Sequence, residues 1–511
     1  MKFNTSPVIA GVDTPPISEA AGWLDPATPP ERVINLCQAV PSYAPAEALM
    51  DEVGRAAHEA GTGVYTDVLG TDELRARYAQ QVSSVYGTTV APNEVAITAG
   101  CNQAFCVTMM ALGGAGDNVL LTTPWYFNHD MWLRMLGMEV RTFPAITPGS
   151  PYPDPEAAAA LIDDRTRAIV LCTPNNPTGS VYPAEVLAAF HDLCAARGIA
   201  LVLDETYLDF RDTDERPHDL FDRADWGDTL IQLYSFSKVF ALTGYRVGAI
   251  TARAQALIEI EKIMDCVAIC APHIGQRAAL FGLNHLHDWK REKAEMMAHR
   301  TATLRHEFAT QQPGWELASS GAYFAYVRHP FSGVPSKQVA MHLAKEHAML
   351  CLPGSVFGPG QDDYLRLAFA NVGADRMAEV VQRLAAATSK RDLLIQMTQM
   401  RMPGMEKQML SFCDQMVKDD SPSLVRLGRI TQLHLQLAMV MSGTKPDTDE
   451  ITESLNTLLA DPNKDEELFE AVVQAAGALQ ASNHEQETLD AFRAISKAFA
   501  DSKSERVIAM L

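Results

Sequence analysis

Short runs of apolar residues recur through the first half of the chain, and each run ends in polar residues. Residues 168–172, 198–203 and 229–234 form such runs, with aliphatic side chains in most positions. Apolar runs of this length, without alternation, predict strands that are buried on both faces of a parallel sheet. Because the carboxyl ends of such strands meet at one crevice, we expect the polar residues that follow them to form a binding site.

The wider pattern predicts an α/β protein with two domains and an N-terminal arm. Alternating strand and helix signals over residues 46–280 predict a large domain with a mostly parallel sheet and right-handed crossovers. Residues 281–388 predict a smaller α+β domain, with a long polar helix at 287–311 and a strand at 321–327. Residues 1–45 are rich in proline, and we expect an extended arm that lies across a partner subunit.

The last part of the chain, residues 389–511, predicts an all-α extension of four to six helices. One stripe has apolar residues at spacings of three and four, and it comprises Leu424, Leu427, Ile430, Leu433 and Leu437. A methionine-rich stretch comprises Met397, Met400, Met402, Met405 and Met409, a pattern more typical of a helical core than of an adaptable binding surface. The extension shows no catalytic constellation, and our hypothesis is a helical bundle for oligomerisation or partner docking.

Composition and charge narrow the function classes. The chain has 511 residues, of which 47% are hydrophobic and 21% are charged, so it can bury a large core. Its net charge of −21 argues against a nucleic-acid or anionic-membrane surface. The nine cysteines lack paired CxxC spacing and fit reduced thiols better than disulfides or a metal site. With no visible signal peptide or membrane-spanning run, we expect a cytoplasmic protein.

The most informative chemical motif is the segment 234–248, which follows one of the apolar runs. It contains Lys238 in a loop studded with serine and glycine, and Arg246 follows eight residues later. Such a segment suits a phosphorylated aldehyde, because the amine forms a Schiff base while hydroxyl and guanidinium groups bind the phosphate.

Three further polar motifs precede this lysine, each next to an apolar run. One motif runs from Asp204 to Tyr207, and Asp204 lies 34 residues before Lys238. Asn176 lies in an Asn-Pro turn within residues 173–179, and residues 96–103 lead into a helix-like segment. In this order the motifs resemble the pyridoxal-phosphate-dependent aminotransferases of class I/II, the aspartate aminotransferase superfamily. The resemblance covers about residues 30–388.

The resemblance implies pyridoxal 5′-phosphate as the cofactor and assigns catalytic roles. Lys238 would be the Schiff-base lysine, and its freed amine would move a proton between the substrate Cα and the cofactor. Asp204 would pair with the pyridine nitrogen, which keeps the ring an electron sink. Tyr207 and Asn176 would hydrogen-bond the phenolic oxygen.

The resemblance also implies how the rest of the cofactor is held. The phosphate would lie on backbone N–H groups at a helix start and on side chains near Lys238. The backbone groups belong to Gly100, Cys101 and Asn102, and the side chains are those of Ser235, Ser237 and Arg246. Tyr126 would stack on the pyridine ring, with Trp125 as a competing candidate. Tyr65 matches a tyrosine that reaches the neighbouring subunit's phosphate, which implies a homodimer or higher homo-oligomer.

On the substrate side, the chain both matches the family and departs from it. Arg366, in an alternating strand-like segment, resembles the arginine that binds the substrate α-carboxylate. The usual glycine-rich segment is replaced by residues 36–41, which bring Gln38 and Ala39 to the substrate. His273 lies in a segment that faces the substrate or the dimer partner in the family. A structural, hydrogen-bonded histidine is favoured there over a substrate contact. No arginine is nominated for a second substrate carboxylate.

The leading functional interpretation is an aminotransferase that exchanges an amino group between an L-amino acid and a 2-oxo acid. The alternative is a lyase or carbon–carbon bond-forming synthase that uses the same quinonoid chemistry, on S-adenosylmethionine or another activated amino acid, because Lys238, Asp204 and Arg366 serve either reaction. A DNA-binding regulator on the same fold is disfavoured, because its extra domain would be basic and usually N-terminal.

Overall fold

The computed structural model describes most of the chain, which divides into two compact units, residues 1–388 and 389–511. In the first unit the described residues are 4–146 and 152–388. In the second they are 409–410, 413–414, 416–418, 421–441, 448–481, 485–500, 502 and 507. Among the described residues, no helix combines the length and apolar character needed to cross a bilayer.

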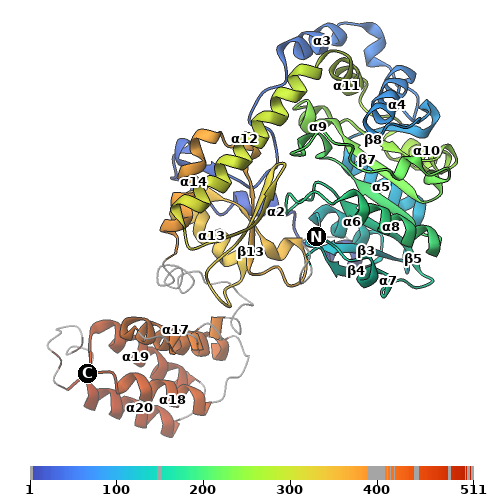
Figure 1. Cartoon of the computed structure of the whole chain (residues 1–511). Coiled ribbons are helices and arrows are strands. Elements are labelled where there is room, and N and C mark those ends of the chain that lie inside the picture. The colour runs from blue at the N-terminus through green and yellow to red at the C-terminus, as the bar shows by residue number, and fades with distance from the viewer. Residues whose placement is uncertain are drawn as a thin grey trace. The chain divides into compact units, whose positions relative to one another are not determined.

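A seven-stranded sheet forms the centre of the first unit (Figure 1). In spatial order its strands are β2 (Val95–Thr98), β8 (Gly248–Thr251), β7 (Leu230–Ser235), β6 (Ala200–Asp204), β5 (Thr166–Cys172), β3 (Asn118–Thr123) and β4 (Glu139–Pro144). Every neighbouring pair is parallel except the two that involve β8. The predicted mostly parallel sheet is therefore confirmed. The run predicted from residue 198 starts at Ala200, because Gly198 ends the preceding helix in a left-handed conformation with φ of 65°.

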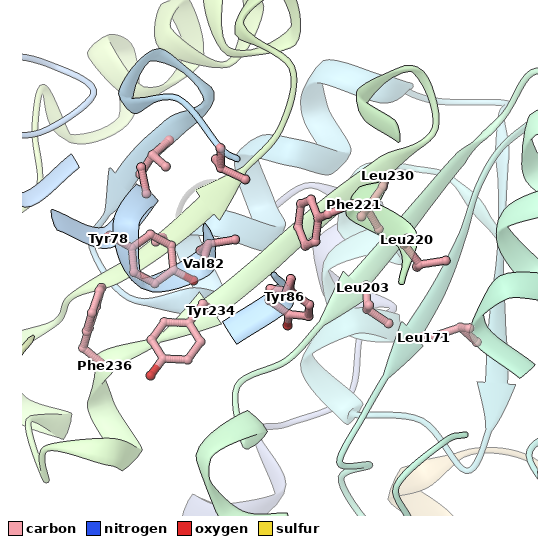
Figure 2. Close-up of a cluster of buried hydrophobic side chains, with 14 of the residues drawn as sticks. Tyr78, Val82, Tyr86, Leu171, Leu203, Leu220, Phe221, Leu230, Tyr234 and Phe236 are labelled. Carbon is pink, nitrogen blue, oxygen red and sulfur yellow. The ribbon is translucent and has the colours of Figure 1, made fainter. Parts of the chain in front are cut away.

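Helices cover both faces of this sheet, which explains the uninterrupted apolar runs. On one face, alternate residues such as Ile169 and Leu171 pack under α4 (Asp72–Tyr86), α8 (Ala184–Arg197) and α11 (His273–His285). Figure 2 shows part of this cluster, with Tyr78, Tyr86 and Tyr234 beside leucines of the strands. On the other face, Ala168 and Val170 pack under α5 (Cys101–Leu112) and α10 (Ala254–Ala268).

A smaller antiparallel sheet follows in the same unit. Its order is β12 (Leu352–Pro353), β13 (Tyr364–Ala368), β10 (Phe324–Arg328) and β9 (Glu316–Gly321), and it is accompanied by α12 (His287–Gln311), α13 (Ser336–His347) and α14 (Met377–Ala386). The predicted strand at 321–327 is confirmed only for residues 324–327, which belong to β10; Gly321 ends β9, and the two strands form a hairpin. Ala322 lies in the turn with φ of 47°, which an apolar pattern does not signal.

The N-terminal residues are less extended than expected. They form two short helices, α1 (Pro7–Ala10) and α2 (Pro16–Ala21), before β1 (Ile34–Asn35). Proline at the first helical position supports both helices, since its fixed φ suits a helix start. β1 then pairs in parallel with β11 (Met349–Leu350), which ties the arm to the smaller part of the unit.

The described residues of the second unit form a helical bundle (Figure 1). Its helices are α17 (Pro422–Met441), α18 (Thr448–Leu459), α19 (Glu466–Ala481) and α20 (Glu485–Ala498). Of the predicted apolar stripe, Ile430, Leu433 and Leu437 are buried in the core of the bundle, and Leu424 and Leu427 are half-buried. Met397, Met400, Met402 and Met405 lie outside the described residues, and Met409 is half-buried.

Candidate active site

The strand ends of the large sheet meet at a cavity of about 230 Å³. Cys172, Asp204 and Ser235, the last residues of β5, β6 and β7, all line it. Residues nominated from the sequence that line the cavity are Gln38, Ala39, Cys101, Asn102, Tyr126, Asn176, Asp204, Tyr207, Ser235, Ser237, Lys238, Arg246 and Arg366. Residues from four strands (β5, β6, β7 and β13), several helices and loops, and the N-terminal segment thus converge on one site.

Four nominated residues lie outside the lining, namely Gly100, Tyr65, His273 and Trp125. Gly100 is directly behind the lining, as the residue before α5. Tyr65 is 74% exposed, so its predicted contact with a neighbouring subunit stays a prediction. His273 begins α11 away from the cavity lining.

Lys238 lines the site with a half-buried side chain. It lies in α9 (Phe236–Val239), one turn of helix directly after β7, and its Nζ donates to the Ala39 carbonyl at 2.5 Å. Burial, with smaller contributions from the charges of Arg366 and Arg246, lowers the pKa of Lys238 to about 8. A substantial neutral fraction therefore exists near neutral pH, and a neutral amine is the nucleophilic form.

Asp204 faces the same cavity as a buried carboxylate. Its Oδ2 is 3.2 Å from Nε2 of His129, and its Oδ1 accepts from the Thr206 backbone N–H at 3.0 Å. Burial raises the pKa of Asp204, but the hydrogen bonds and charge of His129 and the bonds from Thr206 outweigh it, so the pKa is lowered. Asp204 is thus an anion held in a nearly dry site, where it can pair with a cationic N–H group of a ligand.

His129 is a functional residue that the sequence analysis missed. It lies in α6 (Phe127–Met135), lines the cavity, and stacks on Phe105 with ring centroids 4.0 Å apart. The stacking and the bond to Asp204 fix the imidazole in one orientation. The available signal was a histidine three residues after Tyr126 in an aromatic segment, but nothing in the sequence pairs it with Asp204.

One end of the cavity is a cradle of hydrogen-bond donors. The N-terminus of α5 points free backbone N–H groups of Cys101 and Asn102 at it. Gly100 has φ of 83°, and a Cβ there would lie 2.1 Å from Nη2 of Arg246, so only glycine lets the guanidinium reach the helix start. Arg246 donates to Ser237 Oγ at 3.4 Å, and both line the cradle with Ser235. This donor set fits a phosphate dianion.

Aromatic and amide side chains line the middle of the cavity. Tyr126 rather than Trp125 belongs to it, since Trp125 lines a neighbouring cavity and donates to the Val356 carbonyl at 3.3 Å. Burial raises the pKa of Tyr126 to about 12, so its phenol stays protonated. Tyr207 is also buried in the lining, and its pKa is raised by burial.

Arg366 also lines the cavity. It comes from β13 and is 1% exposed, with its guanidinium carbon 5.2 Å from the ring centroids of both Phe324 and Phe357. Nη1 donates to Asn176 Oδ1 at 3.0 Å and Nη2 donates to the Cys37 carbonyl, while Nε has no partner among the described residues. A guanidinium has five N–H donors, so it retains donors for a carboxylate ligand.

The N-terminal segment completes the site. Gln38, Ala39 and Val40 line the cavity, and the Ala39 carbonyl holds the Lys238 amine. Ile17, in α2, lines it as well and was not predicted. The arm therefore contributes an apolar side chain to a site whose chemistry comes from residues far along the chain.

Comparison with known proteins agrees with this geometry. Residues 31–384 match the family Aminotransferase class I and II. The chain belongs to this family. Its members depend on pyridoxal phosphate, and the lysine, carboxylate and phosphate cradle described above fit that cofactor. The family's enzymes are transferases, and so is this protein.

The chain is also similar to named aminotransferases, and it shares its fold with solved structures. It is similar to the aspartate aminotransferase of Sulfolobus acidocaldarius, at 26% identity over 373 residues, covering 69% of this chain and 91% of that protein. It is also similar to the arginine–pyruvate transaminase of Pseudomonas aeruginosa, at 29% identity over 339 residues, covering 65% and 84%. A single mutant of Thermus thermophilus aspartate aminotransferase has the same fold, with a TM-score of 0.67 at 24% identity, covering 75% and 100%. The two relatives are named for different amino acids.

Proposed function

We propose that this aminotransferase exchanges an amino group between an L-amino acid and a 2-oxo acid at the cavity around Lys238. The observation that carries this proposal is an amine with a pKa of about 8 that shares one cavity with an anionic Asp204 and a phosphate cradle. When bound, pyridoxal phosphate supplies an aldehyde that forms a Schiff base with an amine and withdraws electrons from the neighbouring C–H bond.

The residues of the chain would divide the work of binding and proton transfer. Lys238 would hold the cofactor through its amine. Once released, the amine would take a proton from the substrate Cα and deliver it to the cofactor. Asp204 would hold the pyridine N–H, with His129 keeping the carboxylate ionised and oriented. Asn176 and Tyr207 would contact the phenolic oxygen: Asn176 Oδ1 is already bonded to Arg366, which leaves its Nδ2 as the donor.

Substrate orientation would come from Arg366. Arg366 lines the same cavity as Lys238 and its Nε has no partner among the described residues, so a carboxylate bound to the guanidinium would present its Cα to the Lys238 amine. Lysine at this position would offer one point charge instead of a planar fork.

The active form that we propose is a homodimer, in which the exposed Tyr65 reaches the cofactor phosphate of the other subunit. A second copy would cover a tyrosine that is otherwise 74% exposed. A cytoplasmic location stays a prediction from the sequence.

The test is a titration of the purified holoenzyme with a panel of L-amino acids, S-adenosylmethionine included. With the true amino donor, we expect the absorbance band at about 420 nm to be lost and a band at about 330 nm to appear. One equivalent of the matching 2-oxo acid should be released for each converted site. Lys238→Ala should abolish both signals and leave the circular dichroism spectrum unchanged. If instead a long-wavelength band persisted without 2-oxo acid, the lyase or synthase interpretation would replace this proposal.

A further inference from the structure

A polar groove lies along α17 and α18 in the C-terminal unit, with Leu410, Asp414 and Val417 also in its lining, and it shares no lining residue with the cavity described above. Two adjoining hollows of about 760 and 500 Å³ share Arg429, Glu453 and Thr457 as lining residues. Hollows of this size are in the range that small-molecule ligands occupy.

The helical repeat places this groove on a defined face of each helix. On α17 the lining residues Arg429, Gln432 and Gln436 recur at spacings of three and four, which puts them on one side. On α18 Glu453 and Thr457 are four residues apart and face the same groove. The apolar stripe of α17 points instead into the bundle core, so the groove is formed by a polar face that the core does not use.

Two buried polar groups in this groove have no partner. Gln436 is 4% exposed and lines the groove, yet its Oε1 accepts no hydrogen bond. Nε of Arg429 is buried and donates none, and no described residue forms an ion pair with this arginine. Because buried polar groups in folded proteins are nearly always hydrogen-bonded, this donor and this acceptor in one groove are both available to a ligand that carries both functions.

The charges around these two groups define the ligand. Arg429 is the one cation among the described lining residues, and Asp414 and Glu453 are both acids of the inner hollow. Gln432 Nε2 donates to Asp414 Oδ1 at 3.1 Å, while Glu453 has no ion-pair partner among the described residues. A simple anion would meet two carboxylates there, and a simple cation would meet the guanidinium. A zwitterion satisfies both signs.

We propose that this groove binds a free α-amino acid. Its carboxylate lies on Arg429, whose planar fork matches carboxylate geometry, and its ammonium group points to Glu453 and Gln436 Oε1. The neutral or cationic side chain of the ligand then extends into the outer hollow beside Asn456 and Asp461. This second site is independent of the proposed transamination, because all its residues belong to the C-terminal unit.

The experiment is isothermal titration calorimetry of the full-length holoenzyme with each common L-amino acid. The absorbance at about 420 nm is followed in parallel. We expect one amino acid or a small group to bind at a second site that causes no absorbance change. Arg429→Met should weaken this event roughly 10- to 100-fold, as expected for charge-assisted hydrogen bonds, and leave the absorbance titration unchanged. The matched control is Arg493→Met, in α20 and with its side chain 71% exposed, which should leave both events intact.

A second variant tests the ligand class. Glu453→Gln, at an exposed position that cannot disrupt the bundle core, should weaken binding of the amino acid but not of its 2-oxo acid. The proposal is overturned if no amino acid binds without an absorbance change, if Arg429→Met and Arg493→Met behave alike, or if 2-oxo acids bind the groove as tightly as amino acids. Loss of the absorbance change alone would contradict the proposed transamination and leave the groove proposal standing.

Discussion

Replacement of Arg366 by methionine tests whether this buried guanidinium binds the substrate carboxylate. Arg366 lies between Phe324 and Phe357, so a methionine side chain of similar length can fill the space between the rings. Its Nη1 and Nη2 already donate to Asn176 and the Cys37 carbonyl. That leaves three N–H donors for a ligand, one of them the unpartnered Nε.

The expected magnitude follows from these free donors. Two charge-assisted hydrogen bonds to a carboxylate contribute about 1.5–3 kcal/mol each, or about 3–6 kcal/mol together. At about 1.4 kcal/mol per factor of ten, Arg366→Met should lower kcat/KM for the amino donor by about 10²–10⁴-fold. Arg366→Lys should recover little of this loss, because an ammonium cannot form the same paired bonds.

The assay compares the amino donor with the corresponding primary amine, which lacks only the carboxylate. We expect Arg366→Met to remove most of the preference for the amino acid and to leave kcat/KM for the amine almost unchanged. Arg328→Met is a suitable control, since this arginine lies on β10 with its side chain 50% exposed and pairs with Asp363 at the surface. An equal loss for both substrates, or a loss of less than about threefold for the amino acid, would show that the carboxylate is held elsewhere.

Three further predictions concern other parts of the protein. In the cofactor-free protein, Lys238→Met should raise the free energy of unfolding at pH 7 by about 2–4 kcal/mol, because the pKa of this lysine falls from 10.5 to about 8. The folded state resists protonation of Lys238, so the gain in unfolding free energy should be complete below pH 8 and should vanish as pH rises to about 10.5. Urea titrations that gave the same gain at pH 7 and at pH 10.5 would contradict this. His129→Phe keeps the stacking on Phe105 but removes the bond to Asp204, and it should lower kcat at least about tenfold while a fluorescence titration shows the cofactor still bound. A chain that ends at residue 388 should assemble from fewer subunits, as given by the light-scattering mass divided by the mass of the shortened chain, or should have a lower Tm, if residues 389–511 serve assembly. An unchanged number of subunits, with unchanged Tm and kinetics per active dimer, would refute that hypothesis.

The sequence alone was sufficient for the parts of the fold that depend on local pattern. Strands β5, β6 and β7 are buried on both faces, so their apolar runs are continuous and visible. Residues placed directly at their ends, such as Asp204 and Lys238, share the cavity because parallel strands end at one edge. The helical extension was predictable for a similar reason, since Ile430, Leu433 and Leu437 repeat at the helical period.

What the sequence did not contain were contacts between residues far apart along the chain. His129 meets Asp204, 75 residues away in sequence, only because the fold brings α6 and the end of β6 to the same cavity. Ile17 reaches the same cavity from the N-terminal arm, and the hairpin at Ala322 depends on pairing with β9. Each of these is selected by the three-dimensional packing, because neither partner carries a local signal for the other.

The polar groove of the C-terminal unit also combines a pattern that is visible in the sequence with burial that only the tertiary structure sets. The heptad-like spacing of Arg429, Gln432 and Gln436 is visible in the sequence, but a polar stripe on a helix is normally a solvated face. Only the packing of the C-terminal unit buries Gln436 to 4% exposure and leaves its side-chain carbonyl without a partner among the described residues. The sequence determined which chemical groups are present and in which local elements. The tertiary structure decided which of them are dry, paired or unsatisfied, because burial and partnership depend on neighbours that the chain brings together only on folding.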